Sequence, residues 1–290
     1  MILLFLIGFL LSCNDNDGIE ERQTCPDIEV IVNEPKIKDY SETFDSYATP
    51  FLYYYEIMDN QVQKQTYFVA DAGTLNFIPK KEYLYLYNTC GFLEKIEEYD
   101  IGNSKDFIKN QKEYEYDHKG RLVNLFVNGN NINFSGDGLQ TFEYLDNTVS
   151  YKQKYQANGQ KRVVLTFDND GFIIDYTEYA ELFGSTRFTR YKYEYDTDKK
   201  LINAQKLEEN GNWIVTDVFN YSALINPIGI LRNRMFGRQN NTLLNCYYYG
   251  PEFATNNYLD EFIYMSENTE IFDSHNGVAT RFYNFDFSVE

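Results

Sequence analysis

The chain of 290 residues has few of the residues that most often carry catalysis or metal binding, with two histidines, four cysteines and one tryptophan. No CxxC pair occurs, so the clustered cysteine and histidine ligands of a zinc site are missing. The sequence also lacks a G-x-S-x-G nucleophile motif, a glycine-rich phosphate loop and an HExxH motif. These absences predict a protein that is not an enzyme and that holds no cofactor or metal.

Positive charge is scarce as well. The chain has 26 Lys and Arg residues against 44 Asp and Glu residues, which gives a formal net charge of -18 at pH 7. A surface of this charge repels a polyanion rather than recruiting it. We therefore expect no nucleic-acid partner.

The N-terminal segment MILLFLIGFLLSC contains an apolar run of about a dozen residues, short of the roughly 20 that span a bilayer as a helix. It is typical of a secretory signal, although no Lys or Arg precedes the run. The residues Leu10, Leu11, Ser12 and Cys13 resemble the bacterial lipobox, which implies that Cys13 is lipidated. Several acyl chains on Cys13 would anchor the protein in outer-membrane lipid, because each buried CH₂ contributes about 0.8 kcal/mol. The alternative is a signal with an incidental cysteine.

These features divide the chain into a lipoprotein signal peptide (1–12), a flexible acidic tether (13–26) and one β-hairpin repeat domain (27–290). The tether sequence NDNDGIEERQ resembles the acidic stretch that favours export to the outer face of the outer membrane in Bacteroidota lipoproteins. This resemblance implies a protein that faces the cell exterior. An inward-facing periplasmic lipoprotein is the alternative.

If Cys13 is acylated, three cysteines remain, namely Cys25, Cys90 and Cys246. An odd number allows at most one disulfide and leaves a free thiol in an oxidising compartment. The sequence leaves the choice of pair open.

Aromatic residues are abundant, with 27 Tyr and 23 Phe. The stretch YEYDHKGRL (114–122) has close relatives in YLYNTCGFL (85–93), FEYLDNTVS (142–150), TFDNDGFII (166–174) and YEYDTDKKL (193–201). The aromatic residue before each turn recurs at intervals of 29, 28, 23, 28, 26 and 28 residues by subtraction; these residues are Tyr87, Tyr116, Tyr144, Phe167, Tyr195, Tyr221 and Tyr249. A period near 28 suits a β-hairpin with its connections.

The turns have hairpin chemistry. Asp or Asn begins the segments NTCG, DHKG and DNDG, and Gly ends them, as positive-φ turn positions require. Thr148 and Lys199 stand where Gly is expected in two copies, so the turn type there is open. Asn-Gly pairs at 128–131, 157–160 and 210–213 indicate intervening turns of a different kind.

The strands between the turns alternate in polarity. In RYKYEYD (190–196), Tyr191, Tyr193 and Tyr195 point to one face, and the charged residues between them point to the other. One hairpin cannot bury its aromatic face alone, so successive hairpins should build one sheet, which twists and curls. We predict an all-β fold: an antiparallel hairpin-repeat meander that forms a curved, twisted sheet or half-open barrel, with helix nearly absent.

YEYDHKGRL resembles the tyrosine-aspartate (YD) repeat of RHS-type proteins. A lipobox followed by such repeats resembles Bacteroidota outer-membrane lipoproteins that carry a repeat domain of unknown function, and residues 219–262 resemble the ends of those lipoproteins. The resemblance is clearest over residues 80–265. It implies an extracytoplasmic β protein and supplies no catalytic residues.

The flanking segments also have strand patterns. PFLYYYEIMDNQ and KQTYFVADAGTLNFIP should cap the first edge of the sheet, and VATRFYNFDFSVE should supply the last strand.

Few residues are candidates for chemistry. His118 and His275 lie in turn sequences, and solvent-exposed turn residues are the simpler interpretation of both. DNDG (168–171) resembles the start of a Ca²⁺ loop but continues as a strand, so we expect a plain turn. Trp213 is the best candidate for an exposed ring that stacks on a sugar, although sheet core is the simpler role for any one aromatic residue.

We therefore expect a non-catalytic surface lipoprotein that acts as a binding or adhesion module, with a glycan or protein as ligand. The alternative is a periplasmic accessory lipoprotein that docks on a membrane or secretion complex, and a glycan-degrading enzyme is a weaker hypothesis. An exposed aromatic strip on the concave face would favour binding, a large apolar edge would favour docking, and a cleft with facing carboxylates would favour an enzyme.

Overall fold

The computed structural model describes residues 25, 36–45, 51–59, 61–71, 76–101, 110–128, 138–155, 159–182, 184–225, 227–249, 261–264 and 280–288. The elements in chain order are β1 (Lys36–Asp45), β2 (Phe51–Met58), β3 (Gln61–Ala70), β4 (Phe77–Tyr87), β5 (Leu93–Asp100), β6 (Asn110–Tyr116), β7 (Leu122–Asn128), β8 (Gly138–Thr141), β9 (Glu143–Leu145), β10 (Thr148–Tyr155), β11 (Gly159–Phe167), β12 (Ile173–Leu182), β13 (Ser185–Tyr195), β14 (Leu201–Leu207), β15 (Trp213–Val218), β16 (Asn220–Ile225), α1 (Pro227–Phe236), α2 (Arg238–Tyr249), β17 (Glu261–Tyr264) and β18 (Thr280–Ser288).

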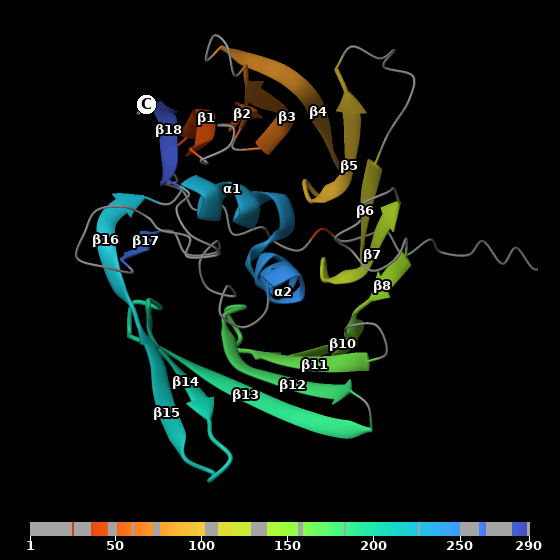
Figure 1. Ribbon diagram of the computed structural model, residues 1–290, viewed down its shortest axis with the longest axis vertical. Helices are drawn as coiled ribbons and strands as arrows, with labels where there is room; N and C mark the ends of the chain where they lie inside the picture. Colours follow the sequence, from red (N-terminus) through yellow and green to blue (C-terminus); the bar gives the residue numbers. More distant parts are fainter. Residues whose placement is uncertain are drawn as a thin grey trace, which may run out of the picture.

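The strands form an antiparallel meander. A nine-stranded sheet has the order β18-β1-β2-β3-β4-β5-β6-β7-β8, a seven-stranded sheet has the order β15-β14-β13-β12-β11-β10-β9, and β16 pairs with β17. Strands β8 and β10 lie side by side, so one sheet follows the other. Figure 1 shows the strands as a curved wall around two helices. The prediction of an all-β antiparallel meander that forms a curved, twisted sheet or half-open barrel is confirmed.

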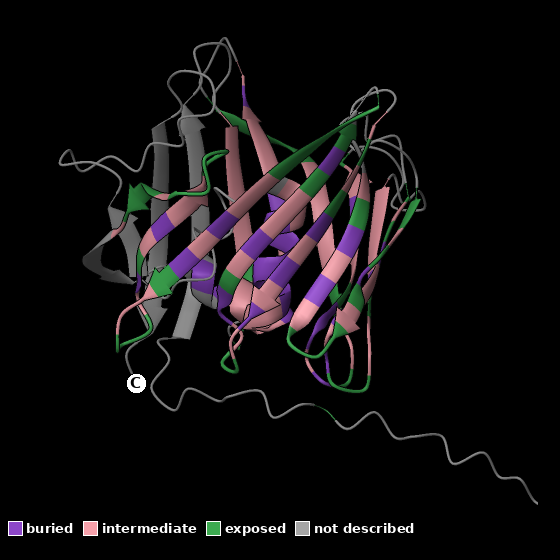
Figure 2. Ribbon diagram, turned by 90° about the horizontal axis from the view of Figure 1, so that it is seen from below, coloured by how far each residue is buried: buried purple, intermediate pink, exposed green. Residues whose placement is uncertain are grey.

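The alternation of side chains along the strands is also as predicted. Tyr191 and Tyr193 on β13 are buried, whereas Glu194 is exposed and Lys192 is half-exposed. Figure 2 shows this alternation as bands of buried and more exposed residues along the strands. The inner face of the wall is therefore the aromatic one.

One five-residue turn recurs along one end of the wall. In the copy that starts at Asp117, the Asp117 N–H donates to the Arg121 carbonyl and the Gly120 N–H donates to the Asp117 carbonyl, each at 2.9 Å. The Asp117 Oδ1 accepts hydrogen bonds from the N–H groups of Lys119 and Arg121. The same backbone and side-chain bonds occur in the turns that begin at Asn88, Asp168 and Asp196.

The fourth residue of this turn requires a positive φ. Gly120 has φ 73°, and Lys199 adopts the same conformation with φ 62°. The turn at Lys199 is thus the same turn without its glycine. Thr148 lies in β10, after a shorter turn in which Asp146 has φ 51°.

The intervening turn at residues 208–211 was expected to differ in kind, and that expectation is wrong. The Gly211 N–H donates to the Glu208 carbonyl, the Glu208 N–H donates to the Asn212 carbonyl, and Gly211 has φ 84°. These are the backbone hydrogen bonds of the other turns, and Glu208 stands at the position of the capping Asp or Asn. Each of the other two Asn-Gly pairs has one residue outside the described ones, so the turns there are not described.

The tyrosine that precedes each turn binds the preceding hairpin. The Tyr116 hydroxyl donates a 2.7 Å hydrogen bond to the carbonyl of Leu93, a fully buried residue. The equivalent bonds run from Tyr87 to Val62, from Tyr144 to Leu122 and from Tyr195 to Ile173. A hydroxyl that satisfies a buried carbonyl stabilises the structure, since an unpaired buried carbonyl is costly. The repeated tyrosine is therefore a link between successive hairpins.

The residue after the turn glycine completes the link by packing on the next tyrosine. Phe92 stacks on Tyr116 with ring centroids 5.2 Å apart, and Phe172 packs on Tyr195 at the same distance. In the copy between them, the Arg121 guanidinium lies over the Tyr144 ring, 4.5 Å from its centroid. Each such pair adds about 0.5–1.5 kcal/mol beyond the area it buries.

Helix was expected to be nearly absent, and within the described part of the chain it is confined to residues 227–249, where a further copy of the repeat at Tyr249 was expected. Pro227 is the first residue of α1. An N–H at this position makes no hydrogen bond within a helix, so proline, which lacks an N–H, is well tolerated there. Gly237, with φ 75°, separates α1 from α2. Tyr249 ends α2 and is not a repeat tyrosine, and Tyr221 in β16 is followed by α1 rather than by a hairpin turn. The last copy of the repeat is therefore the one at Tyr195.

Both helices lie inside the curved wall (Figure 1). Their apolar side chains Leu231, Met235, Phe236, Leu243 and Leu244 belong to the same core as the inward residues of the strands. The buried Asn240 joins α2 to the wall, since its Oδ1 accepts from the Leu122 N–H and its Nδ2 donates to the Gly120 carbonyl, both at 2.8 Å. The helices thus fill the concave side of the sheet.

The flanking segments form strands as predicted, but their places in the sheet differ. Strands β2, β3 and β4 contain the two segments that were expected to cap the first edge, yet β1 and β18 lie outside them. Strand β18 is the last strand in the chain and pairs with β1, with Lys36 opposite Ser288. The C-terminal strand therefore covers the first edge of the nine-stranded sheet.

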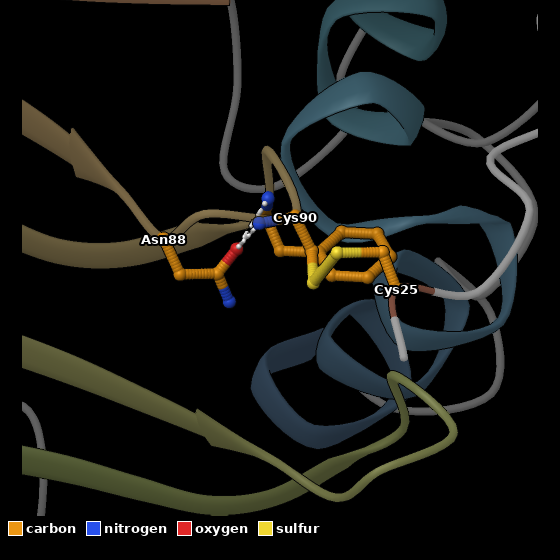
Figure 3. Close-up of a disulfide and its surroundings, with 4 residues drawn as sticks. Cys25, Asn88 and Cys90 are labelled. Atoms are coloured by element: carbon orange, nitrogen blue, oxygen red, sulfur yellow. Dashed lines mark hydrogen bonds between the residues drawn. A yellow bond between two sulfur atoms is a disulfide. The ribbon is translucent and has the colours of Figure 1, made fainter. Parts of the chain in front are cut away.

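A disulfide joins Cys25 to Cys90, the third residue of the turn that begins at Asn88 (Figure 3). The Asn88 Oδ1 accepts hydrogen bonds from the N–H groups of Cys90 and Phe92, so the turn holds the half-cystine in place. Cys246 is a free thiol, fully buried in α2, and burial raises the pKa of this thiol. The structure thereby selects one of the three pairs that the sequence left open.

Candidate binding surface

Most of the aromatic rings are core. Tyr114, Tyr151, Tyr176, Tyr191 and Tyr193 are all buried in the main hydrophobic cluster. The helices cover the concave face, so an exposed aromatic strip on that face, which would have favoured binding, does not form among the described residues. Among the described residues, the most exposed aromatic rings are those of Phe188 and Tyr179.

An outer strip of this kind occurs on the seven-stranded sheet. It consists of Tyr179, Phe188, Arg190, Lys192 and Trp213. Strand register places the five side chains on one face, because Tyr179 is opposite Phe188, Lys192 is opposite Gln205 and Trp213 is opposite Leu207. This face alternates with the buried face of Tyr191 and Tyr193. The strip crosses four neighbouring strands, β12 to β15.

The rings of the strip are accessible to solvent. Tyr179 is 41% exposed and Phe188 is 48% exposed, and their ring centroids lie 5.4 Å apart. Trp213 is half-buried. Two adjacent exposed rings, tilted 51° to one another, and an indole on the same sheet face offer aromatic faces on which a ligand can stack.

Two cations orient the indole. The Lys192 Nζ lies over the Trp213 ring, 4.2 Å from its centroid, and the Arg190 guanidinium lies 5.8 Å from it. Arg190 in turn forms a 2.8 Å ion pair with Asp175, and hydrogen bonding to Asp175 raises the pKa of Arg190. The prediction that Arg190 and Lys192 point away from the tyrosine face is consistent with these contacts. The indole is therefore held by the sheet and not by a loop.

Apolar residues extend the strip toward the edge of the sheet. Val215 and Val218 on β15 are 55% and 67% exposed, and Ile202 on β14 is 40% exposed. Strand β15 has β14 as its one partner within the described part of the sheet. This apolar edge is the feature that would favour docking on a protein.

A polar groove of about 530 Å³ lies at the end of the wall where the turns gather. Its lining includes Arg121, Asn147, Asp168, Asn169 and Gln239. Two of the charged groups in the lining are engaged in ion pairs: Arg121 pairs with Asp117, and Asp168 pairs with Lys199. Burial alone would raise the pKa of Asp117, but the hydrogen bonds from Arg121 and Lys119 outweigh burial and lower it.

The other candidates from the sequence belong to turns. His118 is an exposed residue of the turn that begins at Asp117. The Lys199 ammonium bridges Asp168 and Asp170, at 3.0 and 2.8 Å, so the DNDG segment is a turn held by an ion pair. In the described ranges, no group of three or more histidine, cysteine or acidic side chains is arranged to hold a metal ion. His275 and Cys13 lie outside the described residues.

The most buried acidic side chain among the described residues is Glu98, on the inner face. One carboxylate oxygen accepts from the Lys81 ammonium at 2.6 Å and the other from the Asn110 amide at 2.7 Å. Both oxygens are therefore engaged in contacts between strands. The described residues offer no feature that assigns catalysis to this carboxylate, and the absence of enzymatic activity stays a prediction.

Sequence reasoning did not identify Tyr179, Phe188 or Asp175. Strand alternation signals them, since Phe188 is in phase with Arg190 and Lys192. The pairing of Tyr179 with Phe188 depends on the register between β12 and β13, which the sequence does not give. None of the described helices is long and apolar enough to cross a membrane.

Comparison with known proteins finds no matching family model and no curated protein. Among solved structures, a porin-like protein from Bacteroides uniformis aligns over 62% of this chain and 93% of its own, with 10% identity and a TM-score of 0.31. A protein of unknown function from Bacteroides fragilis aligns over 59% of this chain and 91% of its own, with 14% identity and a TM-score of 0.16. The TcdB2-TccC3 toxin structure aligns over 59% of this chain and 10% of its own, with 9% identity and a TM-score of 0.24. At these scores the neighbours carry no argument about function, and the resemblance to YD-repeat lipoproteins stays a prediction.

Proposed function

We propose that this protein is a non-catalytic, lipid-anchored binding module of the outer membrane that faces the cell exterior and contacts its ligand through the outer strip. The observation that carries the proposal is the exposure of Tyr179 and Phe188 beside the oriented indole of Trp213. Inward tyrosines such as Tyr176, Tyr191 and Tyr193 belong to the core, whereas the rings of Tyr179 and Phe188 lie on the outer face and are not part of it. Cys13 would supply the lipid anchor.

A glycan is the ligand class that suits this surface best. An aromatic face packs against the C–H face of a sugar ring, and Arg190, Lys192 and Asp175 supply donors and acceptors for hydroxyl groups at its border. The strip is open rather than pocket-shaped, which suits an extended chain more than a single small molecule.

Affinity electrophoresis tests the ligand. The purified domain is run through native gels that contain starch, xylan, pectin or mucin, beside the variants Trp213→Ala and Phe188→Ala. Retardation by one polymer should be lost in both variants. Phe126→Ala is the matched control, because Phe126 is a 38% exposed ring on β7, outside the strip. Retardation that survives both strip variants, or no retardation in any gel, would reject the glycan proposal.

Protease treatment of intact cells tests the location. An epitope-tagged copy should be digested without lysis, and the Cys13→Ala variant should be released from the membrane fraction. Protection until the outer membrane is broken would favour the alternative function, a periplasmic accessory lipoprotein that docks on a membrane or secretion complex. The apolar residues Ile202, Val215 and Val218 at the β14–β15 edge are the observation that supports that alternative.

A further inference from the structure

We infer that the domain stands on the membrane with the turn end of its wall facing the lipid, and that the Cys25–Cys90 disulfide holds this end nearer to the lipid by shortening the tether. The turn end is the end formed by the segments 88–91, 117–120, 146–147, 168–171 and 196–199, and it is called the turn rim below. The inference rests on the proposed lipid anchor at Cys13. Beyond the anchor, the inferred orientation places the outer strip at the end of the wall that points away from the lipid.

The five turns form one continuous rim. The Asn147 amide donates to Asn169, and the Lys199 ammonium reaches Asp168, so the last three of these turns touch one another. The Gln61 amide donates to the Gly91 carbonyl, which joins the β2–β3 turn to the same rim. An antiparallel meander brings every second connection to the same end, so all of these turns lie together.

The chain enters the domain at this rim. Cys90 belongs to the turn that begins at Asn88, and its disulfide brings Cys25 there. Strand β1 also starts at this end, because Asp39 lies opposite Glu56, close to the end of β2 at Met58. Figure 3 shows the disulfide beside the helices that fill the wall. The tether therefore meets the domain near the middle of its turn end.

The disulfide shortens the tether. From Cys13 to Cys25 the chain advances 12 residues, whereas from Cys13 to Lys36 it advances 23 residues, by subtraction. At about 3.4 Å per extended residue, the maximum reach is about 40 Å with the disulfide and about 80 Å without it. The oxidised tether thus keeps Cys90 within about 40 Å of the lipid surface, half the limit without the disulfide.

The outer strip is directed away from the membrane. Strand β14 leaves the rim at Leu201 and ends at Leu207, and Trp213 follows the turn at 208–211 at the opposite end of the wall. Seven residues of strand place this end about 20 Å farther from the lipid. A ligand on a neighbouring surface would meet Trp213 first, whereas the polar groove lies on the side that faces the lipid.

Trp213 is the one tryptophan in the chain, so its fluorescence reports this distance directly. The lipidated protein is reconstituted in phosphatidylcholine vesicles that contain a small fraction of dansyl-phosphatidylethanolamine, and energy transfer from tryptophan to dansyl is measured. The matched variant carries Trp213→Phe together with His118→Trp, which moves the donor to an exposed position on the turn rim. Transfer should be at least about twofold more efficient from position 118 than from position 213, given a spacing of about 20 Å.

The disulfide is tested in the same assay. Adding Cys25→Ser and Cys90→Ser to the rim variant should lower the transfer from position 118, because the tether lengthens from 12 to 23 residues. Circular dichroism confirms that this variant is folded. Unchanged transfer would overturn the role of the disulfide, and equal transfer from positions 118 and 213 in the oxidised protein would overturn the orientation.

The anchor and the orientation fail in different ways. A Cys13→Ala variant should not sediment with the vesicles. If the protein with Cys13 also fails to sediment, the proposed anchor is wrong. If it sediments and its two donor positions transfer equally, the anchor stands and the orientation is wrong.

Discussion

Replacing Tyr116 with Phe should destabilise the protein by about 1–3 kcal/mol. The substitution removes one oxygen atom and keeps the ring that stacks on Phe92. What is lost is the 2.7 Å hydrogen bond to the Leu93 carbonyl, and Leu93 has no exposed surface. The net value of a hydrogen bond is about 1 kcal/mol, and leaving its buried acceptor unpaired accounts for the rest.

The measurement is urea unfolding followed by circular dichroism, with thermal unfolding as a second observable. For a chain of this size the loss should lower the unfolding temperature by roughly 2–5 °C. Tyr99→Phe is the control, because the Tyr99 hydroxyl donates to the side chain of Glu97 at the surface of the sheet and should contribute under about 0.5 kcal/mol. If Tyr116→Phe and Tyr99→Phe have the same midpoint, the hydroxyl does not link the hairpins and the explanation of the repeated tyrosine fails.

Other predictions follow from the same contacts. Burial raises the pKa of the inward tyrosines Tyr114, Tyr116 and Tyr151 above their usual value of about 10. The stability that they contribute is therefore complete below pH 10 and is lost above it, by about 1.4 kcal/mol per pH unit for each tyrosine. Unfolding measured from pH 7 to pH 12 should show this alkaline loss and no comparable loss between pH 7 and pH 9. Asn240→Ala should cost about 3 kcal/mol in urea unfolding, since it leaves the hydrogen-bond partners of that amide on β7 and its turn buried and unpaired. Lys199→Gly should raise the free energy of unfolding by up to about 1 kcal/mol by relieving a positive φ, whereas Gly120→Ala should lower it by about 1–2 kcal/mol. Destabilisation by Lys199→Gly together with stabilisation by Gly120→Ala would contradict the shared turn. Replacing Cys25 and Cys90 by Ser opens a connection of 65 residues and should cost about 4 kcal/mol, with a fully reduced wild-type sample as the comparison.

The chemistry of the repeat could be predicted because it is local. The capping side chain of Asp117 and the positive φ of Gly120 act within five residues, so the sequence indicates the turn directly. Strand alternation likewise assigns Tyr191 and Tyr193 to one face and Arg190 and Lys192 to the other.

Predictions were wrong where two features competed for one segment. Tyr249 follows the 28-residue spacing of the repeat, yet it ends a helix that begins at Pro227 with a proline in its favoured first position. The wall curves enough to leave an interior, and that interior must be filled, because open apolar space in a core is costly. The helices α1 and α2 fill it. The need for these helices arises from the curvature of the whole sheet, and the local sequence of residues 227–249 does not indicate it.

The candidate surface was only partly predictable for the same reason. Trp213 was identified from its place after a turn, and the structure holds it on a sheet face beside Lys192. Its aromatic neighbours Tyr179 and Phe188 come together through the register of two strands. Register is fixed by the buried face on the other side of the sheet, where a slip of one residue would expose the core.

The sequence by itself determined the repeating unit of this protein: the hairpin, its capped turn, the aromatic face and the charged face. Each of these depends on residues a few positions apart. The tertiary structure alone decided that the Tyr116 hydroxyl reaches Leu93, that Cys25 pairs with Cys90, and that β18 returns to cover β1. These contacts join residues that are far apart along the chain, and they exist only because the curvature of the assembled wall brings their partners within bonding distance.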